Sequence, residues 1–314
     1  MASIVGVSRT GPPYARPMVA DLSPLGVWTF TLDQQPATRA VELAAELEAM
    51  GWGAIWVPEA VGRDPFVHAT LLLSGTERIV VATGIANIYS RDAMAMNAVW
   101  QSVSEAFPSR FVLGLGVSHQ PMVEGLRGHD YGPPLAAMRD YLDRMDGALF
   151  LGAPPTEPPE RVLAALGPKM LGLARDRGRG AHPYLVPPEH TAQAREILGP
   201  DALLAPEQKV VCETDPARAR EIARGSLGMY LPALANYANN LRRLGYSEED
   251  LTAPLSDHLV DALVAWGTID TIAARIRAHH DAGADHVAVQ VLPRGDVDAM
   301  MRDHRALAQA LDIG

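Results

Sequence analysis

One cysteine, Cys212, stands alone among the 314 residues of this chain. A single thiol excludes an internal disulfide bond and suits a reducing compartment, so we expect the protein to be cytoplasmic. The sequence also lacks any apolar run of about 18 residues, the length that a membrane-spanning helix needs. It shows no basic segment followed by an apolar one near its beginning. We therefore expect neither membrane insertion nor export.

Lysine is almost absent as well. Lys169 and Lys209 are the only two, and acidic residues outnumber basic ones by 37 to 27, which gives a net charge of −10. No block of basic residues interrupts this pattern, so we expect no nucleic-acid partner. No Gly-x-Ser-x-Gly motif occurs, and no spacing of histidine, cysteine and carboxylate residues predicts a metal site. We expect the ligand to be a small molecule.

What the sequence does contain is a regular alternation of short apolar runs with longer amphipathic segments. Buried parallel strands are near-continuous apolar runs, and their alternation with helices indicates a parallel α/β fold. A (β/α)8 barrel needs about 250 residues, so we predict a single TIM-barrel domain over residues 22–314. Residues 1–21, with Pro12, Pro13 and Pro17, are expected to form a loose N-terminal arm.

Eight strands and their crossover helices can be assigned along the chain. The predicted strands are Leu25–Thr31, Ala54–Glu59, Ile79–Ala86, Phe111–Val117, Arg161–Leu166, Ala181–Val186, one that includes Val210–Glu213, and His286–Leu292. The predicted helices are Ala37–Met50, Pro65–Ser74, Ala93–Ala106, Leu135–Phe150, one that opens at Pro168, Glu189–Leu198 and Asp296–Leu311. Residues 215–265 predict a helical insertion between strands seven and eight. Ser118–Pro134 predicts a long polar loop of the kind that often binds ligands.

Small and polar residues follow two of these strands at the point where each strand ends. Strand three closes with Gly84, Ile85 and Asn87, and strand four closes with Gly116 and Val117. The carboxyl ends of parallel strands form one edge of a barrel, where the active sites of this fold lie. Glycine lets a flat ligand approach the backbone, although a simple strand-to-helix turn also explains it. The third glycine of a dinucleotide-binding loop is missing, which disfavours a Rossmann fold.

Two titratable residues belong to the same edge. Glu59 ends strand two, and His119 comes just after strand four. Burial raises the pKa of a carboxyl group, and histidine exchanges a proton near neutral pH, so either side chain is a candidate for proton transfer. The alternatives are a helix-capping carboxylate and an ordinary surface or core histidine.

Gly167, Pro168 and Lys169 join strand five to its helix. Proline suits the first helical position, and free N–H groups at a helix start bind anions, so we predict a phosphate site here. The alternative is an ordinary helix start. We interpret the charged and histidine-rich segments on the opposite face of the barrel as structural: Arg175, Arg177, Arg179, His279, His280, Asp285 and His286.

Together, four segments resemble the bacterial luciferase-like family of flavin and deazaflavin oxidoreductases, and in particular its actinobacterial branch that uses the deazaflavin coenzyme F420. These segments are Ala82–Asn87, Phe107–Gly116, Leu166–Leu171 and Trp266–Thr268. The resemblance covers about residues 22–312. It implies a barrel with an insertion before strand eight, a cofactor across the carboxyl edge and a homodimer. It also implies a cis peptide bond between Gly84 and Ile85, behind the cofactor ring.

The activity that this resemblance implies is hydride transfer between F420 and a small organic substrate. Carried over to this sequence, the cofactor-binding residues are Gly84, Ile85, Asn87, Gly116, Val117, Gly167, Pro168 and Lys169, the last three at the phosphate. Trp28, Glu59, Asn87 and His119 would border the substrate pocket.

The sequence departs from the family at one informative position. Related sugar-phosphate dehydrogenases have an acid-histidine pair after strand two, where this chain has Glu59 and Ala60, so their substrate is not inherited. We expect His119 and Glu59 to be the catalytic residues: His119 transfers the proton, and Glu59 is its electrostatic partner or the alternative proton-transfer group. An FMN-dependent luciferase-like monooxygenase on the same barrel is the first alternative. A non-catalytic flavin- or deazaflavin-binding protein is the second.

Overall fold

The computed structural model describes residues 22–231 and 233–313, so the predicted N-terminal arm at 1–21 lies outside the described residues. Short strands alternate with helices along these ranges. The strands are β1 (Leu25–Trp28), β2 (Ala54–Val57), β3 (Val80–Thr83), β4 (Ala86–Asn87), β5 (Phe111–Gly116), β6 (Glu160–Leu163), β7 (Gly180–Ala181), β8 (Leu203–Leu204), β9 (Glu207–Val211), β10 (Val264–Trp266) and β11 (Val287–Val291). They form one parallel sheet in the order β10-β9-β11-β1-β2-β3-β5-β6-β7-β8, with β4 paired to β5.

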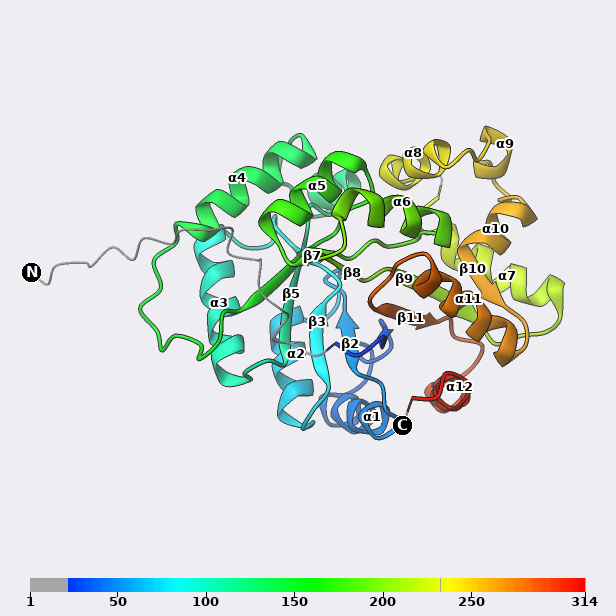
Figure 1. Ribbon diagram of the computed structural model, residues 1–314, viewed down its shortest axis with the longest axis horizontal. Coiled ribbons are helices and arrows are strands. Elements are labelled where there is room, and N and C mark those ends of the chain that lie inside the picture. The colour runs from blue at the N-terminus through cyan, green and yellow to red at the C-terminus, as the bar shows by residue number, and fades with distance from the viewer. Residues whose placement is uncertain (1–21, 232, 314) are drawn as a thin grey trace, which may run out of the picture.

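This sheet closes on itself because β8 and β9 share one strand position, interrupted at Pro206. Backbone hydrogen bonds continue across the interruption: the Ala205 N–H donates to Ala181 at 2.9 Å, and the Glu207 N–H donates to Pro183 at 2.9 Å. On its other side β9 pairs with β11, which pairs with β1. The predicted parallel barrel is confirmed, with helices around the outside of the sheet (Figure 1).

Helical segments connect each strand to the next, except between β3 and β4 and between β8 and β9, and the first turns of several helices are marked in the sequence. The α-helices are α1 (Ala37–Ala49), α2 (Pro65–Ser74), α3 (Ala93–Ala106), α4 (Pro134–Asp146), α5 (Pro168–Arg177), α6 (Pro188–Leu198), α7 (Pro216–Leu227), α8 (Ala235–Arg243), α9 (Glu248–Leu251), α10 (Asp257–Leu263), α11 (Ile269–Asp281) and α12 (Val297–Ala310). Four of them begin after an aspartate whose carboxylate accepts an N–H of the first turn: Asp64, Asp92, Asp215 and Asp296. Among the described residues, no helix is both long and apolar enough to cross a membrane.

Alternate residues of each strand face the helices and the barrel interior. On β2, Ile55 belongs to the apolar layer beneath the helices, whereas Trp56 belongs to a second cluster inside the barrel. On β3, Val81 and Val80 divide in the same way. This period of two is the geometry of a strand that is buried on both faces.

The predicted insertion consists of α7, α8, α9 and α10, shown in yellow-green to orange in Figure 1. It packs around its own apolar cluster, which includes Leu227, Tyr237 and Leu259 and reaches the barrel at Val211 and Leu292. Its last residues differ from the prediction, because Val264–Trp266 is strand β10, paired with β9. The insertion is therefore attached to the carboxyl end of the barrel.

Several predicted boundaries were wrong. Strand seven begins at Glu207 and ends before Glu213, because its first residues are polar yet completely buried and the apolar pattern does not show them. The third strand is divided into β3 and β4, and the sixth is reduced to two residues. The loop Ser118–Pro134 contains a π-helical turn, η1 (Pro121–Leu126), and the helix after it ends at Asp146, four residues before the predicted end.

Candidate functional site

The carboxyl edge of the barrel has a break in strand pairing between β3 and β4. Gly84 and Ile85 occupy this break, and the peptide bond that joins them is cis, as the resemblance implies. Next to it, the Thr83 hydroxyl donates to the Gly114 carbonyl oxygen at 2.7 Å and accepts the Gly114 N–H at 2.8 Å. Pairing with β5 then resumes along β4. A side-chain hydroxyl thus replaces backbone partners, so that Gly84 and Ile85 form a bulge.

The positions around this bulge have room only for glycine, because neighbouring protein atoms would clash with a side chain. A Cβ atom on Gly84 would lie 2.6 Å from Trp28 Nε1 and 3.2 Å from His182 Nε2. A Cβ atom on Gly116 would lie 2.3 Å from the Cδ1 atom of Ile85. Sequence reasoning assigned these glycines to ligand approach, but packing of the protein already requires them.

Aromatic side chains support the bulge from inside the barrel. Trp28 Nε1 donates to the Gly84 carbonyl oxygen at 3.1 Å, and His182 stacks on Trp56 at a centroid distance of 4.1 Å. His182 Nδ1 lies 2.7 Å from the Ala205 carbonyl oxygen, so Nδ1 carries the proton of the neutral ring. Burial lowers the pKa of His182 to about 3, and its Nε2, buried without a partner, therefore presents a lone pair toward Gly84.

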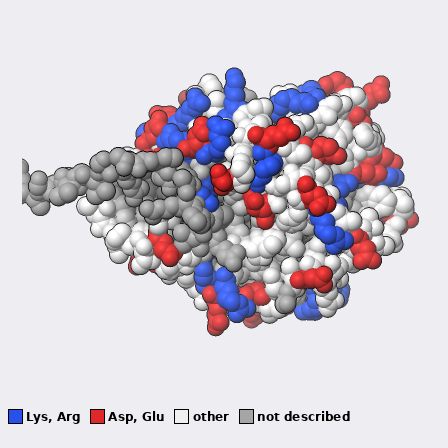
Figure 2. Space-filling model, viewed as in Figure 1, with Lys and Arg blue, Asp and Glu red and all other residues white. Residues whose placement is uncertain are grey.

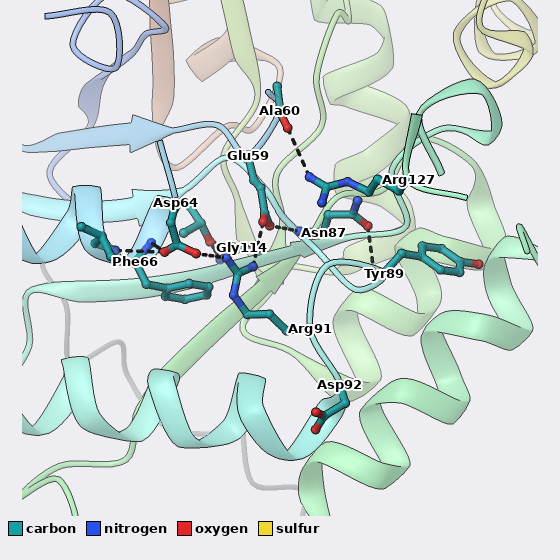
Figure 3. A network of polar contacts seen from close by, with 12 residues as sticks. Glu59, Ala60, Asp64, Phe66, Asn87, Tyr89, Arg91, Asp92, Gly114 and Arg127 are labelled. Carbon is teal, nitrogen blue, oxygen red and sulfur yellow. Dashed lines mark hydrogen bonds and ion pairs between the residues drawn. The ribbon is translucent and has the colours of Figure 1, made fainter. Parts of the chain in front are cut away.

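Glu59 connects the segment after β2 to β4 and to the loop that follows β4 (Figure 3). Its two oxygens accept Arg91 Nη1 at 2.8 Å and the Asn87 N–H at 2.7 Å, and its side chain is only 7% exposed. Asn87 Oδ1 in turn accepts the N–H of Tyr89 at 2.9 Å. Burial opposes the Arg91 charge, but Glu59 and Asp64 together raise the pKa of the guanidinium. Sequence reasoning missed Arg91, whose only signal was its position among carboxylates at this edge.

His119 lies against the insertion. Its ring centroid is 5.4 Å from that of Tyr237, and its side chain hydrogen-bonds Asn236. Burial lowers the pKa of His119, and the bond to Asn236 only partly opposes this shift, so the imidazole is neutral at pH 7 and able to accept a proton. The described hydrogen bonds of Glu59 go to Arg91 and Asn87, not to His119.

Five aromatic residues form an aromatic wall that runs from β1 to the insertion: Trp28, Phe30, Tyr184, Tyr230 and Tyr237. Successive ring centroids lie 4.8 Å (Trp28–Phe30), 4.9 Å (Trp28–Tyr184), 5.4 Å (Tyr184–Tyr230) and 5.7 Å (Tyr230–Tyr237) apart. Of these residues, sequence reasoning identified Trp28 alone. The tyrosines were missed because no local pattern shows which side chains of the insertion, or of the segment after β7, face the site.

A buried polar cluster lies behind this wall on β9 and β11. Lys209 Nζ donates to Glu207 Oε1 at 3.1 Å and to Gln290 Oε1 at 2.9 Å, and it lies 3.8 Å from the ring centroid of Tyr184. Burial lowers the pKa of Lys209 and raises that of Glu207, whereas the attraction between the two groups opposes both shifts. A buried charge persists only when it is paired in this way.

The loop after β5 folds back over the edge. Val117 is half-buried against the apolar core, and Ser118 takes a left-handed conformation with φ 55°. Arg127 Nη2 then donates to the Ala60 carbonyl oxygen at 3.2 Å (Figure 3), and the Tyr131 hydroxyl donates to the Ser118 carbonyl oxygen at 3.3 Å. The predicted long loop is thus attached to the segments that follow β2 and β5.

A second part of the site lies at the start of α5. Gly167 precedes the helix without any side-chain cap, Pro168 is its first residue, and Lys169 is exposed. From the insertion, Arg243 Nη2 comes within 3.5 Å of the position that a Cβ atom on Gly167 would occupy, and it donates to Asn240 Oδ1 at 3.0 Å. The Nδ2 atom of Asn240 is buried without a partner. An uncapped helix start beside a guanidinium and an unused amide donor is suited to an anion. Sequence reasoning missed Arg243 and Asn240.

The charged segments of the opposite face make internal contacts. Arg177 pairs with Asp143 and Asp146, and Arg195 pairs with Asp285 at 2.6 Å. The buried ring of His279 hydrogen-bonds neighbouring side chains through both nitrogens. Residues 22–231 and 233–313 contain no group of three or more His, Cys, Asp or Glu side chains able to hold a metal ion. On the face shown in Figure 2, acidic and basic side chains are interspersed.

Comparison with known proteins shows the family to which this chain belongs. Residues 22–286 match the family described as luciferase-like monooxygenase, and the chain belongs to that family. A protein of Mycobacterium tuberculosis, provisionally named a coenzyme F420-dependent oxidoreductase, is 25% identical over 90% of this chain and 97% of its own length.

Solved structures share the fold. An F420-dependent secondary alcohol dehydrogenase, in complex with an F420-acetone adduct, superposes with a TM-score of 0.74 at 14% identity, covering 91% of this chain and 98% of its own. The oxygenating component of a diketocamphane monooxygenase from Pseudomonas putida, in complex with FMN, superposes with a TM-score of 0.65 at 15% identity, covering 91% and 97%. At these identities the likeness shows the fold alone.

Proposed function

We propose that this member of the luciferase-like monooxygenase family is a cytoplasmic oxidoreductase that transfers a hydride between coenzyme F420 and a small organic substrate. The observation that carries the proposal is the pairing of two features on one barrel edge. One is the bulge at Gly84 and Ile85, which offers backbone and an aliphatic side chain to a flat ring. The other is the anion site at Gly167 and Arg243. The relative in Mycobacterium tuberculosis that is provisionally named a coenzyme F420-dependent oxidoreductase supports this choice of cofactor.

The residues present fit such a cofactor. Gly167, Pro168 and Lys169 would hold its phosphate at the start of α5, and Arg243 and Asn240 would supply two further donors. The ring would rest against Gly84 and Ile85, with Asn87, Gly116 and Val117 next to it. Because Trp28 and Thr83 fix the bulge, this surface is formed before any ligand binds.

F420, when bound, supplies a carbon that accepts or gives a hydride. The protein positions the two reactants and transfers the substrate proton. Neutral His119 would accept or return the substrate proton. Glu59, which is held by Arg91, would fix the orientation of Asn87, and Asn87 would contact the substrate. The aromatic wall would exclude water and keep the two reactants face to face.

Two alternatives follow from specific observations. The FMN complex among the structural neighbours favours an FMN-dependent monooxygenase, which would use the same edge for different chemistry. A non-catalytic flavin- or deazaflavin-binding protein would need only the bulge and the anion site. A homodimer that forms through α3 and α4 remains a prediction from the sequence. The absence of a nucleic-acid or membrane partner is also still a prediction.

Titration of the purified protein with F420 and with FMN tests the proposal. We expect F420 to bind more tightly and to exchange hydride with at least one member of a panel of alcohols and carbonyl compounds. Arg243→Gln should weaken F420 binding about tenfold or more, since it removes a charge-assisted contact. Arg242→Gln is the matched control, because the neighbouring Arg242 pairs with Glu248 on the exposed side of α8, and it should bind normally.

Three results would count against this function. Tight FMN binding without F420 binding supports the monooxygenase. F420 binding without hydride exchange across the whole panel supports the binding protein. Equal F420 affinity in the two arginine variants removes Arg243 from the site.

A further inference from the structure

The buried polar cluster fixes the direction of a chain of hydrogen bonds that ends in the aromatic wall. It begins with Lys209, whose ammonium group has donors only and is completely buried between Glu207 and Gln290. The Gln290 atom that faces Lys209 at 2.9 Å must therefore be the amide oxygen. Lys209 is paired with Glu207 at 3.1 Å, and this ion pair leaves none of its charge for a ligand.

That oxygen determines the next link. The Tyr184 hydroxyl lies 3.0 Å from Gln290 Oε1, and an amide oxygen accepts but never donates, so Tyr184 gives its only hydrogen to Gln290. The hydroxyls of Tyr184 and Tyr230 are 2.9 Å apart, which is a hydrogen bond. Because the Tyr184 hydrogen is already used, Tyr230 must be the donor in this second bond. The Tyr230 oxygen then has lone pairs and no hydrogen left to offer.

Tyr230 belongs to the partly exposed side of the aromatic wall, whereas Gln290 and Lys209 are buried behind it. Its ring lies 5.7 Å from that of Tyr237, which in turn packs 5.4 Å from His119. Burial raises the pKa of Tyr230 to about 12, so the phenol keeps its proton at neutral pH. The Tyr230 oxygen is therefore a neutral hydrogen-bond acceptor.

We propose that Tyr230 is a specificity-determining residue that accepts a hydrogen bond from a hydroxyl group of the substrate, so that the site selects small neutral alcohols over the matching carbonyl compounds. This inference rests on the proposed function, whose substrate it narrows. A carbonyl oxygen placed at Tyr230 would face lone pairs and lose the hydrogen bond that it makes with water. An anionic substrate would find Lys209 already neutralised by Glu207. The rings of the wall favour an apolar body next to the hydroxyl.

Binding of matched probes tests this selection. Cyclohexanol and cyclohexanone differ by one hydrogen donor at nearly equal size, and their dissociation constants can be measured by ligand-observed NMR, with and without F420. We expect wild-type protein to bind cyclohexanol about fivefold or more tightly than cyclohexanone, the usual effect of one neutral hydrogen bond. The preference needs no hydride transfer, so it can succeed or fail independently of the proposed function.

Three variants sharpen the test. Tyr230→Phe should abolish the preference, because it removes the acceptor. Tyr184→Phe should abolish or reverse it, because Tyr230 then has a free hydrogen to donate to cyclohexanone. Tyr246→Phe, a half-buried tyrosine elsewhere on the insertion that packs on His258, should leave the preference unchanged. Thermal unfolding of each variant shows that the fold is retained.

Each outcome of the binding experiment either supports the proposal or overturns it. A fivefold alcohol preference that Tyr230→Phe abolishes supports the proposal. An alcohol preference well below fivefold, equal binding of the two probes, binding of neither, or a preference that survives Tyr230→Phe overturns it. Tighter binding of cyclohexanone by wild-type protein also overturns it, since Tyr230 would then donate and Gln290 would present its amide nitrogen to the cluster.

Discussion

At the scale of single residues, the glycines of strand β5 and the glycine within helix α5 have different explanations. Gly114 and Gly116 lie on β5 beside the bulge, where a Cβ atom would meet the Thr83 carbonyl oxygen at 1.9 Å and the Ile85 side chain at 2.3 Å, respectively. Gly172, within α5, has nothing within 4 Å of that position. The strand glycines are therefore required by the bulge, whereas the helical one is replaceable.

Gly114→Ala should destabilise the protein by about 1–3 kcal/mol, because the Thr83 backbone cannot move aside as a flexible side chain would. Gly172→Ala is the matched control. It should stabilise by up to about 1 kcal/mol, since alanine is the better helix former and meets no obstacle. Denaturant unfolding of both variants measures the difference. Equal free energies of unfolding would mean that β5 does not depend on the contact with Thr83.

At the scale of elements, apolar runs predicted most strands and helices, and they failed where a buried strand is polar. The segment Glu207–Lys209 has three polar residues in succession, and they lie in β9 with almost no exposure. Glu207 and Lys209 neutralise each other inside the barrel, whereas Gln208 points outward and hydrogen-bonds His279. Only the folded arrangement supplies these partners, so a pattern of hydrophobicity could not reveal the strand.

The candidate site was predictable to the extent that it lies at strand ends. Glu59, Asn87 and His119 were predicted as site residues because they lie at strand ends, and Asn87 also because of the family resemblance. Arg91, Arg243 and the tyrosines of the insertion were not, because they reach the edge from loops and helices whose orientation depends on tertiary packing. The two parts of the site that sequence reasoning missed most completely therefore come from the insertion.

At the scale of the whole molecule, buried histidines connect stability to pH. Burial lowers the pKa of His68 and His286 to about 4, and of His182, His279 and His304 to about 3. In the unfolded chain these groups titrate near 6.5. Between about pH 6.5 and pH 4 the unfolded state therefore binds more protons than the native state, and stability falls as the pH falls.

Each such histidine should contribute a slope of up to about 1.4 kcal/mol per pH unit in this range. His304→Phe should reduce the slope by up to about 1.4 kcal/mol per pH unit, the contribution of one bound proton. His304 is buried against Trp52, and its Nδ1 has no hydrogen-bond partner. His129→Gln, at an exposed position, should leave it unchanged. Free energies of unfolding measured from pH 4.5 to 7 give the slopes. A slope that His304→Phe leaves intact would show that this histidine is protonated in the native state.

A crystal structure of the protein with bound coenzyme F420 tests the central claim most directly. The account predicts that the deazaflavin ring lies against Gly84 and Ile85 at the end of β3 and that the phosphate lies between the start of α5 and Arg243. A ring bound elsewhere, with the bulge facing only protein or solvent, would contradict it.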